Sequence, residues 1–236
     1  MTGVSEWLVP DWRLPANVHA VFTTRAGGFS EGPYAGLNLG LHVGDEPALV
    51  ARNRQALVQM LPAEPAWLDQ VHSNRCLSIG SAVPDDNKAD AAFTDQKNRV
   101  LAVMVADCLP ILLSEANGQG VAVVHAGWKG LANGVIASTL KNLRGEWMAW
   151  LGPAIGPCHY EVGTEVRQAF ESGMGFSERG DRWMMDLKRV ARAQLEQAGV
   201  RRVTSAEECT FCLPDRYYSY RRDGVTGRMA GLIWFS

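Results

Sequence analysis

The chain has no long hydrophobic run and no block of like charges, and each absence argues against a class of function. No stretch of about 18 uncharged apolar residues occurs, so no transmembrane helix is expected. The first residues lack the basic and apolar segments of a secretory signal, so a cytoplasmic location is expected. The formal net charge is only -2, which gives no electrostatic footprint for nucleic acid or an anionic membrane. A small molecule is therefore the expected partner.

Disulfides are also not expected. The five cysteines are an odd number in a chain without an export pattern, so reduced thiols are predicted. A cysteine with a special role is then a metal ligand or a nucleophile. The 236 residues are 47% hydrophobic, enough to bury a core, and show no convincing linker. We predict a single domain over residues 1–236.

Strand-like and helical segments alternate irregularly, which predicts an α+β fold. Several strands are joined by turns too short for a parallel crossover, so mixed sheets are expected. One helix is predicted over residues 127–143, and a pair of strands within residues 217–235 around Asp223-Gly224. A break at residues 108–110 is expected between two strands. Apolar runs predict strands at residues 18–25, 66–73, 100–107, 110–116, 120–126 and 147–151.

Three potential metal ligands lie at strand ends or turns: His72 in DQVHSN, Cys108 in ADCLP and His125 in VHAGWKG. A His-Cys-His set suits Zn²⁺, and three protein ligands leave a fourth position for water or substrate, as in catalytic sites. No short motif fixes their geometry. A nucleophilic pair of Cys108 with His125 as its base is equally compatible with the same residues.

The remaining cysteines and histidines are less informative. Cys209 and Cys212 form a single C-x-x-C with no second pair or nearby histidine and no redox-type helix after it. We interpret this motif as coincidence rather than metal or disulfide chemistry. His42 and His159 are expected to form local hydrogen bonds outside the site.

Three cations are candidates for binding phosphate or carboxylate. Arg25 begins a Gly-rich loop, Lys129 lies at the start of the predicted helix, and Arg221 follows an aromatic run. Guanidinium groups and helix N-termini both bind such anions well.

A series of short phrases now identifies a resemblance. In order along the chain they include TTRAGG, GLNLGLHVGD, QVHS, ADA at residues 90–92, ADCLP, HAGWKG, GPAIGPCHYEVG and SYRRDGVTGR. With these phrases, from about Phe22 to the C-terminus, the chain resembles the YfiH-like laccase-domain family, also known as the multicopper polyphenol oxidase family. Lys129 stands where the family has arginine. Lysine keeps the positive charge but cannot bind an anion through two parallel N–H groups as a guanidinium does.

The resemblance implies a layered α/β/β/α fold and a zinc site formed by His72, Cys108 and His125. It also implies purine nucleoside phosphorylase activity on adenosine, inosine and 5′-methylthioadenosine, with adenosine deamination as a second activity. The family has further been linked to peptidoglycan editing and, under its older name, to the oxidation of phenols.

The residues help to choose among these activities. A four-copper oxidase needs on the order of ten imidazoles, whereas this chain has five His and no H-x-H pair. The zinc-deaminase signature, H-x-E with P-C-x-x-C, is also absent. If deamination occurs, Asp107 is the first candidate for its acid or base.

We therefore predict a zinc-dependent enzyme that acts on purine nucleosides with phosphate. The predicted catalytic residues are Cys108, His125, Asp107 and Arg25, and the predicted phosphate ligands are Arg25, Lys129 and Arg221. One alternative is an amide hydrolase for cell-wall precursors with Cys108 as nucleophile, and another is a zinc ion that only fastens the sheets together. Copper is expected to replace zinc in some purified preparations because it binds many such sites more tightly.

Overall fold

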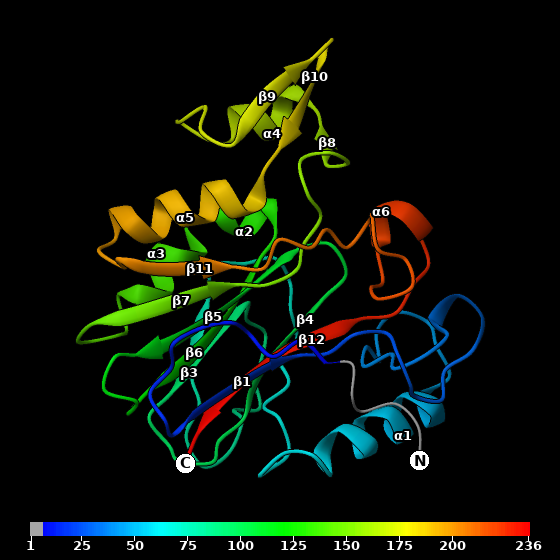
Figure 1. Cartoon of the computed structure of the whole chain (residues 1–236), viewed down its shortest axis with the longest axis vertical. Coiled ribbons are helices and arrows are strands. Elements are labelled where there is room, and N and C mark those ends of the chain that lie inside the picture. Colours follow the sequence, from blue (N-terminus) through cyan, green and yellow to red (C-terminus); the bar gives the residue numbers. More distant parts are fainter. Residues whose placement is uncertain (1–6) are drawn as a thin grey trace.

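The computed structural model describes residues 7–236 and contains three β-sheets with helices packed around them (Figure 1). The α+β class with mixed sheets is confirmed. In chain order the elements of these residues are β1 (Val18–Phe22), the 3-10 helix η1 (Gly32–Tyr34), α1 (Pro47–Val58), β2 (Cys76–Ser78), β3 (Ala91–Thr94), β4 (Leu101–Val105), β5 (Leu109–Glu115), β6 (Val121–Ala126), α2 (Trp128–Ala132), α3 (Val135–Leu140), β7 (Trp147–Leu151), β8 (Glu161–Val162), α4 (Thr164–Gln168), β9 (Phe176–Arg179), β10 (Arg182–Met185), α5 (Leu187–Gln197), β11 (Arg202–Ser205), α6 (Tyr220–Asp223) and β12 (Met229–Phe235).

The largest sheet has six strands in the order β11-β7-β5-β6-β3-β2. β11 runs parallel to β7 and β2 runs parallel to β3, while the other neighbours are antiparallel. Every residue of β6 and β7 is buried. A strand that is covered on both faces has consecutive apolar residues, whereas a strand covered on one face alternates apolar and polar residues. This explains why this part of the sequence predicts strands so clearly.

The two faces of this sheet pack against different partners. On one face, Ile111 and Val124 pack with Val190 of α5 in a core that also includes α3. On the other face, Leu112 and Val123 pack against the second sheet, which has the order β1-β12-β4. The far side of that second sheet is covered by α1, where Leu57 joins the apolar side chains of β4 and β12.

The third sheet lies at the edge of the first core, which Val162 of β8 and Met185 of β10 join. Its three short strands have the order β8-β10-β9, and in Figure 1 it extends away from the body of the molecule above α5. All of these strands lie between β7 and α5 in the chain. The resemblance gave no expectation of this additional sheet.

The chain passes from one large sheet to the other between β4 and β5. β4 pairs with β12 in the three-stranded sheet, and β5 pairs with β6 and β7 in the six-stranded sheet. Residues 106–108 make the crossing, and Asp107 adopts a φ of 92° to do so. The expected break therefore falls slightly earlier than predicted, since Leu109 and Pro110 already belong to β5. This crossing places Cys108 between the two sheets.

Three local predictions are wrong. The helix expected over residues 127–143 is divided into α2 and α3, because Gly134 adopts a φ of 76° between them. The strand pair expected in residues 217–235 is α6 followed by the single strand β12. Residues 66–73 form no named strand and contribute only isolated bridges from Ala66 and Asp69.

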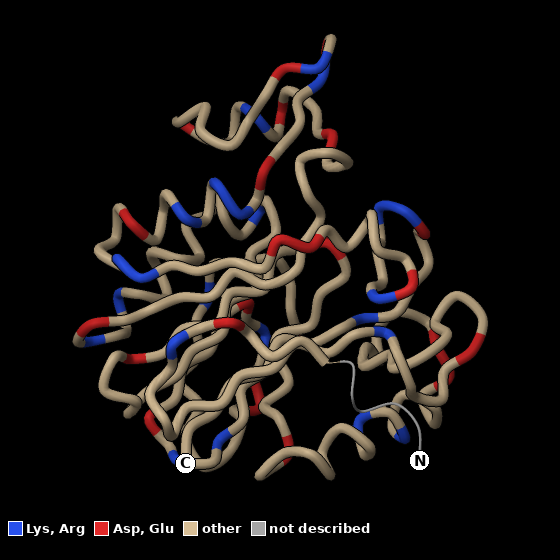
Figure 2. Tube along the Cα trace, viewed as in Figure 1, with Lys and Arg blue, Asp and Glu red and all other residues tan. Residues whose placement is uncertain are grey.

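Charged residues of both signs are distributed over the molecule. Figure 2 shows lysine and arginine interspersed with aspartate and glutamate along most of the trace. Within residues 7–236, no helix is long and apolar enough to cross a membrane.

Candidate functional site

The three candidate metal ligands come together at the seam between the two large sheets. The donor atoms of His72, Cys108 and His125 all lie within 4.8 Å of one another. The Sγ of Cys108 is 4.0 Å from Nε2 of His72, and the two imidazole rings lie edge to face with centroids 4.9 Å apart. One ion of ordinary size can be reached by all three donors.

Each ligand is positioned by a different element. Cys108 lies on the crossing between sheets, His125 is the last residue but one of β6, and His72 lies in the loop before β2. Gly127, directly after β6, leaves the space that the thiol occupies. A Cβ atom at Gly127 would lie only 2.8 Å from Sγ of Cys108, so any larger residue would displace the thiol.

The buried carboxylate of Asp90 holds both histidines. Its Oδ1 accepts hydrogen bonds from Nδ1 of His125 at 2.8 Å and from the backbone N–H of His72 at 3.0 Å. Its Oδ2 accepts from the N–H and the hydroxyl of Ser73 at 2.6 and 2.8 Å. Because Nδ1 of His125 donates to the carboxylate, Nε2 is left with its lone pair free for a metal.

The charge state of Asp90 supports this role. Burial opposes ionisation, but the hydrogen bond and charge of His125 and the hydrogen bonds from Ser73 hold the pKa of Asp90 below its usual value. An ionised carboxylate accepts only, so His125 must be the donor. Sequence reasoning assigned no role to Asp90. The available signal was its place in the phrase ADA, immediately before β3.

Without a metal, Cys108 and His125 stabilise each other's charged forms. Burial raises the pKa of the thiol, but His125, and to a smaller extent His72, lower the pKa of Cys108 to about 6. Burial lowers the pKa of the imidazole, yet Cys108 and Asp90 raise the pKa of His125 to about 9. At neutral pH the metal-free site is therefore a thiolate beside an imidazolium.

Two adjoining pockets reach the candidate ligands, one lined by His72 and Cys108 and the other by all three. The Lys129 pocket has a volume of about 290 Å³ and also contains Arg221, Tyr160 and Trp128. The Arg228 pocket has a volume of about 420 Å³ and also contains His42 and Gln70. Both are lined by His72, Ala106, Cys108 and Tyr220. A substrate with two parts can thus lie across the candidate metal centre.

Two of the three predicted anion-binding cations line a pocket. The exposed Lys129 and Arg221 both face the Lys129 pocket. The guanidinium of Arg221 donates to the carbonyl of Glu161 at 2.6 Å and lies over the ring of Tyr160, with 4.9 Å to the centroid. Arg228, which sequence reasoning missed, lines the second pocket.

Arg25 lies elsewhere. Its guanidinium donates to the carbonyls of Pro214 and Ala35 at 2.9 and 3.3 Å and lies over the ring of Tyr218. It is absent from the lining of both pockets. The observed contacts join the Gly-rich loop to the segment that precedes α6.

Asp107 borders the Lys129 pocket, but its carboxylate is occupied by hydrogen bonds. Oδ1 accepts from the hydroxyl of Thr210 at 2.6 Å, and Oδ2 accepts from Ser219 at 3.0 Å and from the N–H of Arg221 at 2.6 Å. These bonds hold the residues around α6 against the crossing segment. The predicted acid or base role of Asp107 stays a prediction.

A second group of potential metal ligands lies outside these pockets. Cys158, His159, Cys209 and Cys212 bring their donor atoms within 4.8 Å of one another. The sequence predicts an isolated C-x-x-C because no histidine is near it in the chain. That prediction is wrong, because the fold brings Cys158 and His159 next to Cys209 and Cys212. The partners come from the loop after β7, about 50 residues earlier.

The matches to known proteins extend over nearly the whole chain. The family model described as multi-copper polyphenol oxidoreductase laccase matches residues 19–236. The chain is 42% identical to purine nucleoside phosphorylase YfiH of Shigella flexneri over 241 residues, covering 98% of this chain and 99% of that protein. It is 44% identical over 242 residues to a purine nucleoside phosphorylase of Pseudomonas aeruginosa, with the same coverage.

Solved structures agree with this result. Neisseria meningitidis protein NMB0706 superposes with a TM-score of 0.94 at 42% identity, covering 98% of this chain and 100% of that chain. YlmD from Geobacillus stearothermophilus superposes with a TM-score of 0.89 at 31% identity, covering 100% and 98% respectively.

The hydrogen bonds of Asp90 lead to a prediction about metal affinity. Asp90→Asn removes the charged acceptor that orients His125, and is expected to weaken Zn²⁺ binding at this site about 10- to 100-fold. Competition with a chromophoric chelator measures the affinity. Asp95→Asn is the matched control because Asp95 is exposed and lies outside both pockets. Equal affinities for the two variants would show that Asp90 does not position a ligand.

The thiolate of the metal-free site leads to a prediction about pH. In metal-free protein, alkylation of Cys108 by iodoacetamide is expected to be half-maximal near pH 6, since its pKa is lowered to about 6 and the thiolate is the reactive form. Cys76 is an internal control because burial raises its pKa to about 11. Mass spectrometry after short pulses at a series of pH values resolves the two sites. A Cys108 reactivity that rises only above about pH 8, as for an ordinary thiol, would refute the ion pair.

Proposed function

The chain belongs to the multi-copper polyphenol oxidoreductase laccase family, and we propose that within this family it is a zinc-dependent purine nucleoside phosphorylase. The proposed substrates are phosphate with adenosine, inosine or 5′-methylthioadenosine. One observation carries the proposal: an open set of three metal ligands lies where two pockets meet, and one of these pockets contains two cations. Curated relatives that carry this name align over almost their entire length.

The donor set supports zinc as the resident metal. One thiolate and two imidazoles, with the Nε2 of His125 left available by Asp90, match the ligand preferences of Zn²⁺ and leave a coordination position vacant. Bound there, the metal would supply Lewis-acid polarisation of a substrate oxygen. Copper in a purified preparation would reflect its higher affinity for many N and S sites rather than function.

The copper-oxidase reading of the family name has little support in this chain. A laccase with four coppers needs on the order of ten imidazoles, and only five His exist here. Of these, His72 and His125 lie in the open site, His159 lies in the other cluster, and His19 stacks on Trp234. The imidazoles are too few and too dispersed for the copper centres of such an enzyme.

Phosphate is placed in the Lys129 pocket in this proposal. Lys129 supplies an exposed charge there. The backbone N–H of Arg221 donates to Asp107, and its guanidinium donates to the carbonyl of Glu161. A fixed guanidinium binds an oxyanion with little loss of side-chain entropy. We propose that Arg25 and Asp107 act as positioning residues, since their polar groups hold the loops that form this wall.

The reaction is then a displacement at the sugar. An oxygen of hydrogen phosphate forms a bond to the anomeric carbon while the bond from that carbon to the purine nitrogen breaks, and the base leaves with the proton that the phosphate loses. The two cations offset the charge of the attacking phosphate, and the adjoining Arg228 pocket has the volume for the nucleoside. Both reactants can thus be held at one centre.

Adenosine deamination is proposed as a second activity of the same site. Water would replace the amino group at C6, with the amino group leaving as ammonia. Asp107 borders the Lys129 pocket beside Cys108 and is the candidate acid or base for this reaction. Its three hydrogen bonds would keep the carboxylate aligned.

A Cys-His hydrolase is the second candidate function, because one feature of the site favours it. Cys108, His125 and Asp90 have the order of nucleophile, base and orienting carboxylate, and the thiol has a lowered pKa. The two candidates differ in their need for metal. Metal-stripped protein that cleaves an amide of a cell-wall precursor and forms an acyl adduct on Cys108 would favour the hydrolase.

The phosphorylase proposal predicts a product that depends on phosphate. Metal-quantified protein given adenosine is expected to release adenine only when phosphate is present, as measured by chromatography. His125→Ala removes a ligand and is expected to reduce kcat/KM about 100-fold or more. His19→Ala is the control because His19 lies on β1, outside both pockets. Inosine formed without phosphate would identify deamination, and no product from any nucleoside would rule out the proposed function.

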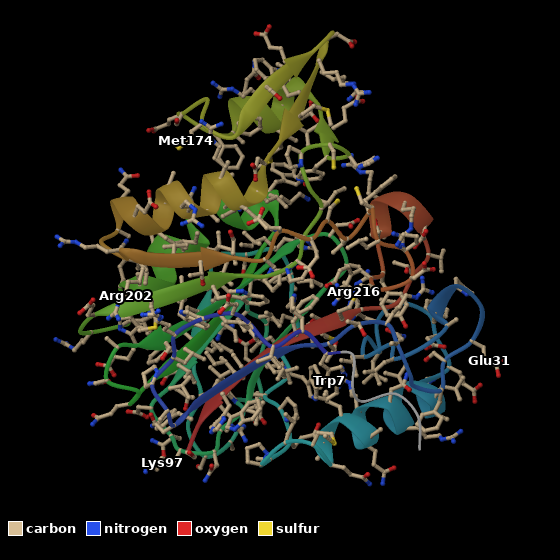
Figure 3. All side chains as sticks on the ribbon, viewed as in Figure 1. Trp7, Glu31, Lys97, Met174, Arg202 and Arg216 are labelled. Carbon is tan, nitrogen blue, oxygen red and sulfur yellow. The ribbon has the colours of Figure 1, made fainter. Side chains whose placement is uncertain are left out.

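The placement of phosphate leads to a separate prediction. Arg221→Gln removes a charged donor and is expected to raise the KM for phosphate about 10-fold, with a smaller change in the KM for adenosine. Arg202→Gln is the control, because Arg202 lies at the start of β11 and pairs with Glu146 (Figure 3). Steady-state kinetics with each substrate varied in turn make the comparison. An equal rise in both KM values would count against a phosphate site at Arg221.

A further inference from the structure

Four soft metal ligands meet behind the wall of the Lys129 pocket. Cys158 and His159 lie in the loop that connects β7 to β8, and Cys209 and Cys212 lie in the loop between β11 and α6. The two loops run side by side, and Ala154 forms a parallel bridge with Cys209. The four donor atoms lie within 4.8 Å of one another. We propose that these residues form a second zinc site, separate from the one at His72, Cys108 and His125.

The distances between the donors match a tetrahedral ion. Bonds of about 2.3 Å to sulfur and about 2.0 Å to nitrogen place tetrahedral ligands about 3.8 Å apart for two sulfurs and about 3.5 Å apart for sulfur and nitrogen. Here Sγ of Cys158 is 3.7 Å from Cys212 and 4.0 Å from Cys209. The Nδ1 of His159 is 3.2 Å from Sγ of Cys158 and 3.3 Å from Sγ of Cys212. An ion at the centre needs only small movements of these side chains.

Neighbouring groups hold two of the ligands in place. The backbone N–H of Gly156 donates to Sγ of Cys209 at 3.1 Å, a contact that stabilises a thiolate. The imidazole of His159 is stacked on the ring of Phe211, with centroids 4.1 Å apart and an angle of 14° between the planes. This stacking fixes the direction of the ring. A set of orienting contacts around the ligands is typical of a metal site.

A disulfide accounts for these residues less well than zinc. A bond between two of the thiols would leave the third cysteine and the imidazole at short distances without a function. Three thiolates and one imidazole are a complete ligand set for a structural zinc ion. The two sites also differ in kind, because four protein ligands close this one, whereas three ligands leave the first site open to substrate.

The second site would stabilise one wall of the Lys129 pocket. The loop after β7 supplies Ile155 and Tyr160 to this pocket. The loop after β11 supplies Thr210, whose hydroxyl donates to Asp107. An ion between the loops would therefore stabilise the pocket wall. It would also stabilise the position of Asp107, which accepts a hydrogen bond from the N–H of Arg221. Figure 3 shows Arg216, at the end of the second loop, on the side of the molecule near α6.

Metal content tests the proposal directly. Full-length protein saturated with zinc and dialysed is expected to retain about two Zn²⁺ per chain by elemental analysis, one for each cluster. Cys212→Ser and His72→Ala are each expected to retain about one, from different sites. Cys76→Ser is the control, because Cys76 belongs to neither cluster, and should retain the wild-type content. Wild-type content in Cys212→Ser would overturn the second site.

Cobalt substitution keeps the test decisive if Cys212→Ser does not fold. In Cys108→Ser the first site has no thiolate, so strong thiolate-to-cobalt charge-transfer absorption in this variant must come from the second cluster. Its appearance on addition of Co²⁺ and its loss on addition of excess Zn²⁺ are the expected results. No such absorption, or a disulfide among Cys158, Cys209 and Cys212 by mass spectrometry without reductant, would overturn the proposal. Neither measurement uses a nucleoside, so its outcome is independent of the proposed activity.

Discussion

The candidate active site depends on one buried carboxylate. Asp90 is fully buried, and its two oxygens accept hydrogen bonds from the side chain of His125 and from the backbone of His72 and Ser73. A buried charge is tolerated only when such bonds replace water, so the segment before β2, the start of β3 and the end of β6 are held in one arrangement. His72 adopts a φ of 59°, a conformation that needs this kind of support.

The seam between the two large sheets gives this carboxylate its surroundings. The crossing from β4 to β5 carries the thiol, and β6 carries the imidazole on the face directed at the second sheet, where Val121 and Val123 also point. Apolar side chains pack on both sides of the seam, and the burial of His125 and Asp90 strengthens the electrostatic contact between them. A thiolate and an imidazolium can then stabilise each other despite burial, and the same donors offer a metal a preformed set of ligands.

The two cysteine-containing clusters illustrate how ligand number determines what a metal can do. The open cluster has three donors and borders two pockets, so a bound ion there remains accessible to substrate. The cluster of Cys158, His159, Cys209 and Cys212 has four donors, which would saturate zinc. The contribution proposed for an ion there is mechanical, because the two loops carry Tyr160 and Thr210 to the wall beside Arg221. The family name refers to copper, but five histidines are too few for the copper centres of a four-copper oxidase.

The sequence by itself predicted the α+β class, the apolar strands β4 to β7 and the candidate ligands His72, Cys108 and His125, because strand periodicity and ligand chemistry are local properties. It assigned Lys129 and Arg221 to an anion site, and both line one pocket. Only the tertiary structure decided that β4 and β5 belong to different sheets, that Arg25 is directed at backbone carbonyls, and that Asp90 supports the histidines. The tertiary structure alone placed His159 next to Cys209 and Cys212. These features depend on segments far apart in the chain, and the distance between such segments is set by packing rather than by spacing in the sequence.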